Sequence, residues 1–362
     1  MTATQKRARR IAGGLALGIL LPLALFSMIE FLVVTTGSAP PEQDPLVLWN
    51  PHRDQELTES KGEFRFSRQW LWEPRPGAMV YGAPINRGGY RGPYYPEERS
   101  DRLRIAVMGD SSTYATKLSE DASFARVLET ALRERDCSVE VLNFGVIGFT
   151  IAQGLRLYEG RVRTYRPDIV IAAFGAVNDQ HLTLADLVDE KKLTRISRLR
   201  YRIREFLQRY ASIRLLNQLR AGESDGQHEI EQDQLASRVP LADFERCLRD
   251  LHRAVLADGG QLVLVSPPRR FDGEARFPRT LEYTEALLRL ARELDLPLAD
   301  VRESFRAGDL EALGPDLLEQ PHLGVESTLF IDPWHPSPAG HRRYAVVIGR
   351  ALERAGLLPG VR

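Results

Sequence analysis

The feature that most constrains the fold is an alternation, from residue 103 onward, of short apolar runs with longer amphipathic stretches. The runs are rich in Val, Ile and Leu, which is typical of strands buried on both faces. They cover residues 103–108, 139–142, 169–174 and 262–265. Stretches with helical spacing lie near residues 121–134, 151–164, 241–257, 279–294 and 338–355. Apolar strands separated by helices predict a mostly parallel sheet covered on both faces, which is a three-layer α/β/α sandwich.

Composition narrows the class of protein further. The 362 residues are 43% hydrophobic and 27% charged, which excludes a disordered chain, a collagen-like fibre and a multi-span membrane protein. Lysine plus arginine and aspartate plus glutamate each number 49, so no net charge would attract nucleic acid. Cys137 and Cys247 form no Cys-x-x-Cys pair for zinc or thiol exchange. In an exported protein they either pair or remain buried thiols, and the sequence leaves both open.

The amino terminus has the pattern of a membrane segment. Four basic residues at positions 6–10 precede an apolar run from Ile11 to Ile29, and only Glu30 interrupts its continuation. Nineteen helical residues rise about 28 Å, close to the thickness of the hydrocarbon core, so one spanning helix fits. Because basic flanks stay cytoplasmic, we predict an uncleaved single-pass anchor over residues 1–35, with Glu30 at the outer interface and the bulk of the chain periplasmic or at the cell surface. A cleaved signal peptide is the alternative, although its apolar region usually has only about 7 to 15 residues.

Two further segments stand apart from the alternating pattern. Residues 36–100 are rich in Pro, Gly, Arg and Tyr, which predicts a loop-rich exported extension before a main domain at residues 101–362. Part of this extension should pack on the main domain, because it carries the aromatic residues Trp70, Trp72, Tyr81, Tyr90, Tyr94 and Tyr95. Residues 181–240 form a predicted helical insertion, in which residues 181–220 hold ten Lys and Arg against four Asp and Glu. Such a basic surface suits an anionic membrane or an acidic polymer, and a merely solvated helix face has the same composition.

Three of the predicted strands are followed directly by residues that suit chemistry. In parallel sheets ligands bind beyond the carboxyl ends of the strands, so these residues are candidates for a site. Ser111 lies in a Gly-Asp-Ser-Ser turn, where a hydroxyl and its own N–H can face one cavity. Gly148 can direct a backbone N–H at a ligand, and the neutral amide of Asn178 suits an oxyanion. Taken singly, each of these motifs also describes an ordinary turn.

A histidine near the carboxyl terminus has an acidic partner. Asp332 and His335 lie three residues apart in a loop that contains prolines and precedes a predicted helix. At that spacing the carboxylate can hold one imidazole nitrogen and leave the other free to act as a base. We therefore expect His335 to be the base, rather than His341 or His181.

The order of these four residues makes the chain resemble the SGNH hydrolases, also called the GDSL esterase and lipase family, whose blocks carry Ser, Gly, Asn and His. The resemblance covers residues 103–352 outside the insertion, and residues 86–92 are similar to a segment of membrane-tethered bacterial members. It implies a flavodoxin-like fold with a nucleophile, a base and its acidic partner, and an oxyanion hole. The implied nucleophile is Ser111, the implied base is His335 and its acidic partner is Asp332. The implied oxyanion hole consists of the N–H groups of Ser111 and Gly148 together with Asn178.

The sequence departs from the family pattern in two places. The third block usually reads Gly-x-Asn-Asp, whereas two residues separate Gly175 from Asn178 here, which implies a slightly different setting of Asn178. Ser112 stands where the family often has an apolar residue, and we expect it to form a polar wall beside the nucleophile.

These residues predict a serine ester hydrolase that works through an acyl-enzyme. An exported, anchored enzyme has access to acetylated carbohydrate and to lipid esters. We expect acetyl groups on carbohydrate as the first substrate class and lipid esters as the second. An O-acyltransferase with the same residues and a non-catalytic polymer-binding module at the membrane surface are the alternatives. Phosphate-loop, zinc and dinucleotide motifs are absent from the sequence, so we expect no cofactor and no metal. A Gly-x-Ser-x-Gly match at residues 222–226 lacks a preceding strand, so we do not expect its serine to be the nucleophile.

Overall fold

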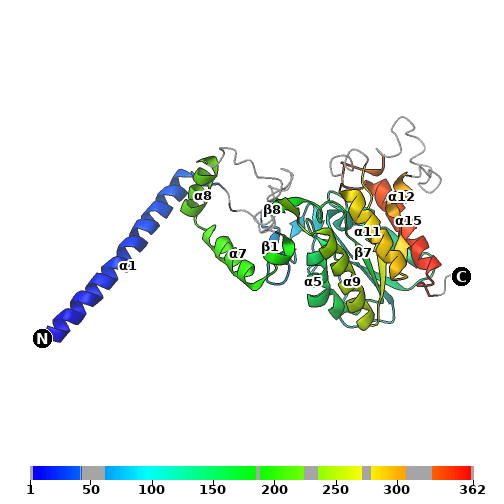
Figure 1. Ribbon diagram of the computed structural model, residues 1–362, viewed down its shortest axis with the longest axis horizontal. Helices are drawn as coiled ribbons and strands as arrows, with labels where there is room; N and C mark the ends of the chain where they lie inside the picture. The colour runs from blue at the N-terminus through cyan, green and yellow to red at the C-terminus, as the bar shows by residue number, and fades with distance from the viewer. Residues whose placement is uncertain are drawn as a thin grey trace. The chain divides into compact units, whose positions relative to one another are not determined.

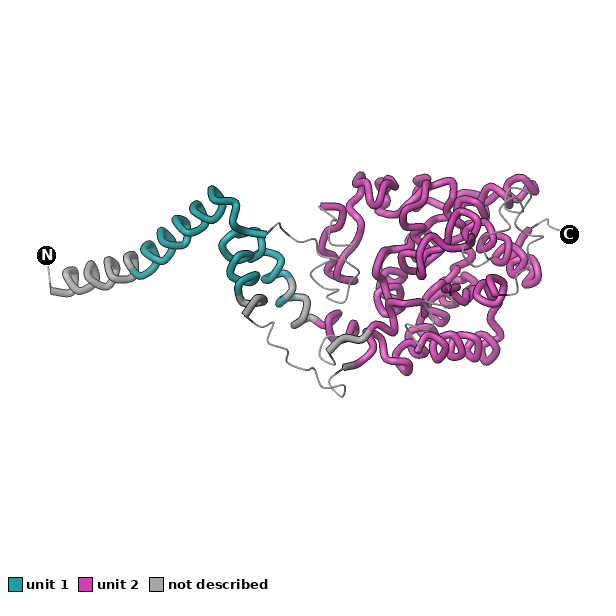
Figure 2. Tube along the Cα trace, turned by 90° about the horizontal axis from the view of Figure 1, so that it is seen from above, with its two compact units in different colours: residues 1–43, 199–230 teal, residues 44–198, 231–362 magenta. Residues whose placement is uncertain are grey.

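The computed structural model describes residues 3–40, 42, 62–184, 188–223, 235–270, 279–306 and 328–359. The chain forms two compact units, which are coloured separately in Figure 2 and are described here one at a time. Unit 1 comprises residues 1–43 and 199–230, and unit 2 comprises residues 44–198 and 231–362. Most of the Gly-x-Ser-x-Gly match at residues 222–226 lies outside the described residues.

Unit 2 is built on a five-stranded sheet in which every pair of neighbours is parallel. The strands lie in the order β11-β10-β7-β5-β6. This is the flavodoxin-like arrangement, in which the first strand of the sheet is followed by one neighbour on each side. The predicted parallel sheet is therefore confirmed. The strand bounds are β5 (Leu103–Gly109), β6 (Val139–Asn143), β7 (Ile169–Ala173), β10 (Gln261–Val265) and β11 (Leu298–Ala299).

Helices cover both faces of this sheet (Figure 1), because the strands are apolar on both faces. Ala106 and Met108 pack toward one face, and their neighbours Ile105 and Val107 pack toward the other. The first face is covered by α5 (Ile151–Gly160), α9 (Leu241–Ala257) and α11 (Thr280–Glu293). The second is covered by α4 (Phe124–Arg133), α12 (Val301–Arg306) and α15 (Pro338–Arg354). Cys137 and Cys247 are free thiols buried in the two different layers, so they do not pair.

Local sequence signals set the starts of the helices that the alternation predicts. The Ser123 hydroxyl accepts a hydrogen bond from the N–H of Arg126 at the start of α4, and Ser337 does the same for Gly340 in α15, where Pro338 is the first helical residue. Thr150 begins α5 with a reciprocal capping box. Unit 2 also contains three shorter helical segments: α3 (Ser111–Tyr114), η2 (Glu120–Ala122) and η3 (Val162–Tyr165).

The extension before the sheet packs into the core of unit 2. Trp72 is completely buried, and its indole Nε1–H donates a hydrogen bond to the carbonyl of Ile147 at 3.0 Å. Trp70 and Tyr90 are buried too, which confirms that part of this segment packs on the main domain. Its two antiparallel strand pairs were not predicted, because each strand is too short to show periodicity. They are β1 (Phe64–Ser67) with β2 (Leu71–Pro74), and β3 (Met79–Val80) with β4 (Ala83–Pro84).

The insertion between β7 and α9 contains helices, as predicted, and in addition an antiparallel strand pair. The strands are β8 (Leu182–Leu184) and β9 (Leu235–Ser237), and the helices are α6 (Asp189–Lys192), α7 (Arg195–Leu207) and α8 (Ala211–Glu223). Buried Asp189 accepts hydrogen bonds from Arg238, at 2.9 Å, and from the hydroxyl of Thr150, at 2.7 Å. These contacts tie the base of the insertion to the loop that precedes α5.

Unit 1 contains the amino-terminal helix α1 (Ala3–Thr36). Its segment Gly18–Thr36 is long and apolar enough to cross a membrane, and a signal sequence has the same properties. The apolar side chains of this segment are mostly exposed; those of Leu20 and Phe31, for example, are 63% and 70% exposed.

Candidate active site

Ser111 lies at the first position of α3, directly beyond the carboxyl end of β5. The chain turns there in very little space, since a Cβ on Gly109 would lie only 2.7 Å from the carbonyl oxygen of Ala173. Asp110 caps α3 by accepting a hydrogen bond from the N–H of Ser112 at 2.9 Å. Ser111 is consequently held, half-buried, at the carboxyl edge of the sheet. At this point the connections that follow neighbouring strands run to opposite faces of the sheet.

His335 reaches Ser111 from the loop before α15, although 224 positions separate them in the chain. The imidazole Nε2 lies 2.9 Å from the hydroxyl oxygen of Ser111, and Nδ1 lies 2.8 Å from Oδ2 of Asp332. Because a carboxylate only accepts hydrogen bonds, Nδ1 donates to Asp332, and Nε2 of the neutral ring accepts from Ser111. The three side chains thus form one continuous hydrogen-bonded series.

Asp332 lies beside the imidazole in an environment that favours its ionised form. Partial burial acts to raise its pKa, but the hydrogen bond and charge of His335 and the N–H groups of Trp334 and His335 outweigh burial and lower this pKa to about 2. The ammonium of Lys117 lies 3.7 Å from the same carboxylate. Asp332 is therefore ionised at neutral pH, as a partner for a protonated imidazole must be.

Asn178 reaches the turn that carries Ser111 despite the longer spacing in its block. Its Nδ2 donates a hydrogen bond to Oδ2 of Asp110 at 3.0 Å. The turn before it is made by Gly175, whose φ of 91° favours glycine, and by buried Asp179, which accepts the N–H of Gly175 at 2.9 Å and of Ile151 at 2.8 Å. Burial raises the pKa of Asp179 to about 7 despite these two donors.

Gly148 lies in the loop between β6 and α5, with a φ of 76° that favours glycine. Both adjoining peptide planes are fixed by side chains. The indole of Trp72 holds the carbonyl of Ile147, in the plane that carries the Gly148 N–H, and Arg238 donates to the carbonyl of Gly148 at 2.9 Å. The orientation of the Gly148 N–H is thus set by Trp72, from the extension, and by Arg238, at the end of the insertion.

Sequence reasoning missed Arg91, which supports the other end of α3. This arginine is buried, with 2% of its surface exposed, and Nη1 donates to the carbonyls of Tyr114 and Ala115, both at 2.6 Å. Nη2 donates to the carbonyl of Leu118 at 2.7 Å. Residues 86–92, which include Arg91, resemble a family segment, but this resemblance predicts no structural role for the arginine.

Ser112 differs from its sequence-based interpretation, and Asp110 had none. Ser112 is not a polar wall of the site: it is buried, and its hydroxyl donates to the carbonyl of Trp334 at 3.2 Å, joining α3 to the His335 loop. Asp110, part of the Gly-Asp-Ser turn, contacts both Ser112 and Asn178. Its burial raises its pKa, against the opposing hydrogen bonds.

His341 lies on α15 and packs against aromatic side chains. Its Nδ1 accepts a hydrogen bond from the N–H of Phe124 at 3.0 Å, and its ring stacks with Phe124 and Tyr344. Complete burial lowers the pKa of His341 to about 3, so it stays neutral. In the described part of the chain no group of three or more His, Cys, Asp or Glu side chains is arranged to hold a metal ion.

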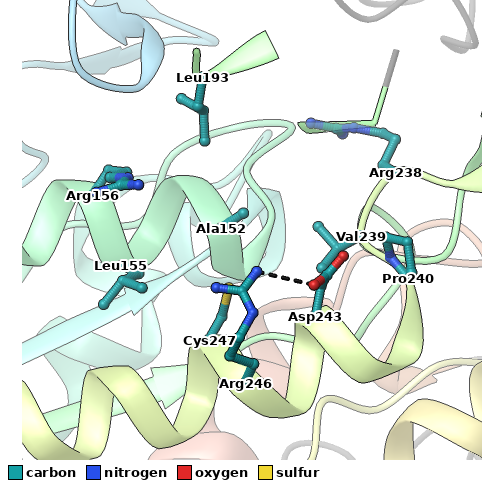
Figure 3. Close-up of a pocket in the computed structure, with 10 residues that line it drawn as sticks. All are labelled: Ala152, Leu155, Arg156, Leu193, Arg238, Val239, Pro240, Asp243, Arg246 and Cys247. Carbon is teal, nitrogen blue, oxygen red and sulfur yellow. Dashed lines mark hydrogen bonds and ion pairs between the residues drawn. The ribbon is translucent and has the colours of Figure 1, made fainter. Parts of the chain in front are cut away.

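A separate small cavity lies between α5 and α9 (Figure 3). Its volume of about 30 Å³ has room for only one or two water molecules. Asp243 and Arg246, three residues apart on α9, both line it and form an ion pair with 2.9 Å between its atoms. Neither Ser111 nor His335 lines it. We therefore place the candidate active site at the sheet edge and not in this cavity.

Comparison with known proteins decides the family. Residues 107–343 match the model of the GDSL-like Lipase/Acylhydrolase family. The chain belongs to this family. The resemblance inferred from its four sequence blocks is thereby confirmed, and so is the prediction that this GDSL-family protein is a hydrolase acting on ester bonds.

Two other comparisons add nothing to this assignment. A search of curated proteins found no match. Among solved structures, a lipase/acylhydrolase from Enterococcus faecalis is 17% identical, covers 72% of this chain and 98% of its own, and has a TM-score of 0.46. An acetylxylan esterase from Geobacillus stearothermophilus is also 17% identical, covers 70% of this chain and 93% of its own, and has a TM-score of 0.43. Because these scores are low, we take the assignment from the family model.

Proposed function

We propose that this GDSL-family hydrolase cleaves carboxylic esters through an acyl-enzyme formed on Ser111. The observation that carries the proposal is the hydrogen-bonded series from Ser111 through His335 to Asp332. All three side chains are half-buried, so a substrate can reach them from solvent while their hydrogen bonds remain protected. A serine, a base and an orienting carboxylate in this geometry are the components of nucleophilic acyl transfer.

In the first half of the reaction, Nε2 of His335 takes the hydroxyl proton as Oγ of Ser111 attacks the acyl carbon. The imidazolium that forms is stabilised by ionised Asp332 and gives its proton to the alcohol oxygen as the ester C–O bond breaks. In the second half, water attacks the acyl-enzyme while His335 accepts a proton from the water. The carboxylic acid then leaves, and Ser111 regains its proton from His335.

We assign the developing oxyanion to three donors: the N–H of Ser111, the N–H of Gly148 and an N–H of Asn178. Support comes from how firmly these groups are held. Trp72 and Arg238 fix the peptide planes around Gly148, and Asp110 binds one N–H of the Asn178 amide, which leaves its second N–H for substrate. Donors fixed before the reaction stabilise charge without paying for reorganisation.

We further propose that α1 is an uncleaved anchor and that the remaining chain lies on the extracytoplasmic side. The basic residues at positions 6–10 and the apolar helix after them support this orientation. The domain organisation we propose is an anchor at residues 1–35, an extension at 36–100 and a hydrolase domain at 101–362 with an insertion at 181–240. In that location we expect the substrate to be an O-acetyl group of exported carbohydrate, with lipid esters as the second candidate.

The test compares two neighbouring serines. In Ser111→Ala, kcat on p-nitrophenyl acetate should fall by about 10⁴-fold or more, because removing the nucleophile of such a site abolishes covalent catalysis. In Ser112→Ala, which loses only the hydroxyl contact to Trp334, most of the activity should remain. Full activity in Ser111→Ala would refute the proposal.

The same enzyme should release acetate from an acetylated polysaccharide. If the acetyl group is passed instead to an added glycan acceptor, the chain is an acyltransferase. If wild type neither hydrolyses nor transfers acyl groups and binds the polymer as well as Ser111→Ala does, the chain is a binding module.

A further inference from the structure

The insertion is fixed to the anchor helix within unit 1. The carboxylate of Glu30 in α1 accepts hydrogen bonds from the N–H of Ala211 at 2.6 Å, the N–H of Ser212 at 2.9 Å and the hydroxyl of Ser212 at 2.6 Å. These are the first residues of α8, whose N–H groups have no acceptor within their own helix. Glu30 therefore serves as the cap of α8.

Two more contacts lie on either side of this cap. The ring of Phe26 in α1 packs edge-on against Tyr210, with 5.2 Å between ring centroids. Nε of Arg214 donates to the carbonyl of Pro40 at 2.7 Å. The turn between α7 and α8 is thus held along the carboxyl-terminal part of α1, beside which Figure 1 shows α8.

The position of Glu30 along α1 sets how deeply this turn lies in the membrane, provided that α1 is the anchor proposed above. With the basic residues up to Arg10 at one membrane surface, about 20 helical residues cross the hydrocarbon core of about 30 Å, so Glu30 lies at its opposite boundary. An isolated carboxylate is costly there. Three hydrogen-bond donors from α8 satisfy it without water.

The α7 helix exposes an apolar stripe beside that boundary. Leu199, Ile203 and Phe206 are 59%, 51% and 52% exposed. Together with Leu207 they fall within an arc of about 100° on the helix surface. Exposed arginines flank the stripe on both sides: Arg200, Arg202, Arg204 and Arg209. Leu216 and Leu219 add exposed apolar surface on α8. An apolar stripe with basic flanks is the pattern of helices that lie in a membrane interface.

We propose that α7 and α8 lie in the membrane interface at the end of α1 opposite its basic residues. The stripe of Leu199, Ile203 and Phe206 enters the boundary between headgroups and acyl chains, and the flanking arginines bind the phosphates of anionic phospholipids. The insertion is then a second membrane contact, built onto the first through Glu30.

Continuity with α1 favours lipid over other occupants of this surface. An acidic polymer would bind the arginines but would leave the apolar stripe in water. A second protein copy would have to cover a stripe that adjoins the apolar surface of the spanning helix, where lipid is already present. Single exposed leucines elsewhere, such as Leu256 on α9, have no such neighbourhood and need no partner.

The experiment places one environment-sensitive fluorophore at a time on the full-length chain, reconstituted in vesicles of phosphatidylcholine and phosphatidylglycerol. The labelling sites are Ile203→Cys on α7, Leu21→Cys on α1 and Leu256→Cys on α9, all of which replace exposed side chains. Cys137 and Cys247 are buried, and burial raises the pKa of both thiols, that of Cys247 to about 12, so brief labelling at neutral pH selects the introduced cysteine. Emission is quenched either by spin-labelled lipid or by aqueous iodide.

We expect the label at position 203 to be quenched several-fold more strongly by spin-labelled lipid than by iodide, and the label at position 256 to show the reverse. Replacing phosphatidylglycerol by phosphatidylcholine should weaken the lipid quenching at position 203, because the arginines lose their anionic partners. Equal quenching in the two lipid mixtures would overturn the anionic part of the proposal.

The label at position 21 separates this proposal from that of the anchor. If lipid quenches position 21 while iodide quenches position 203, the anchor stands and the interfacial helices are refuted. If iodide quenches both, the anchor is refuted as well. A label at position 203 that neither quencher reaches is covered by protein, which overturns the lipid proposal in favour of a second copy or another partner.

Discussion

The two units of this chain place the same kinds of side chain in opposite surroundings. In unit 2, apolar residues such as Ile105 and Val107 are completely buried, and even Arg91 has only 2% of its surface exposed. In unit 1, Phe31 and Leu199 are 70% and 59% exposed. The difference shows that unit 2 forms its own apolar interior, whereas these side chains of unit 1 have none. Under the anchor proposal, lipid would cover them.

The contrast extends to polar groups. In unit 2, hydrogen bonds hold together the loops at one sheet edge, where His335 contacts Ser111 and Asn178 contacts Asp110. In unit 1, they join Glu30 to the start of α8. We expect chemistry and stability to follow this division.

Among the effects that compare the two units, the largest is expected at Asn178. Asn178→Ala should lower kcat about 10² to 10³-fold, which is the scale for loss of one oxyanion donor, with a much smaller change in KM. Steady-state kinetics with p-nitrophenyl acetate provide the measurement. Asn217→Ala, at an exposed position on α8, is the matched control and should leave kcat unchanged. Equal losses in both variants would break the division between the units.

A pair of arginines gives the next largest effect. Arg91→Met should lower the free energy of unfolding by about 2–4 kcal/mol, because three buried carbonyls after Ser111 lose their donor. Arg202→Met, on the exposed surface of α7, should change it by no more than about 0.5 kcal/mol. Denaturant titration of the detergent-solubilised proteins, followed by tryptophan fluorescence, measures both. Similar values for the two variants would contradict the buried role of Arg91.

The smallest effect concerns acid stability. The pKa of Asp332 is lowered in the folded chain from 3.8 to about 2. Its contribution to folding is therefore complete above about pH 5 and is lost as the pH falls through 4 toward 2. Between pH 5 and pH 3 the melting temperature of wild type should fall more than that of Asp332→Asn.

The contribution is small because Asp332 is partly exposed and its interactions are screened by solvent. Asp121→Asn, which removes an exposed carboxylate, serves as control and should follow the wild-type curve. Coincident curves for wild type and Asp332→Asn would show that Asp332 does not gain stability from His335.

The sequence predicted those parts of the fold that leave a local pattern. The continuous apolar runs gave four of the five strands, because strands buried on both faces have few polar residues. The strand at Leu298–Ala299 was missed, since two residues carry no period. The pairs β1–β2 and β8–β9 were missed for a related reason: each becomes stable only through packing and pairing that its own few residues do not encode.

The candidate site could be predicted where residue type and local position define the chemistry. Ser111 directly follows a strand, and His335 lies three residues after Asp332, ahead of a helix. Residues that act through long-range contacts were not. Trp72 reaches the carbonyl of Ile147, 75 positions away, and Arg91 reaches Tyr114 across 23 positions. Ser112 was misinterpreted because its contact with Trp334, 222 positions away, cannot be read from its neighbours.

The central claim is that the imidazole of His335 activates the hydroxyl of Ser111. Labelling of the full-length protein with a fluorophosphonate, followed by peptide mass spectrometry and a time course, tests it most directly. We expect the label on Ser111 in wild type and a labelling rate at least about 10²-fold lower in His335→Ala, since an unactivated serine reacts poorly. Labelling at another serine, or an equal rate in wild type and His335→Ala, would contradict the account.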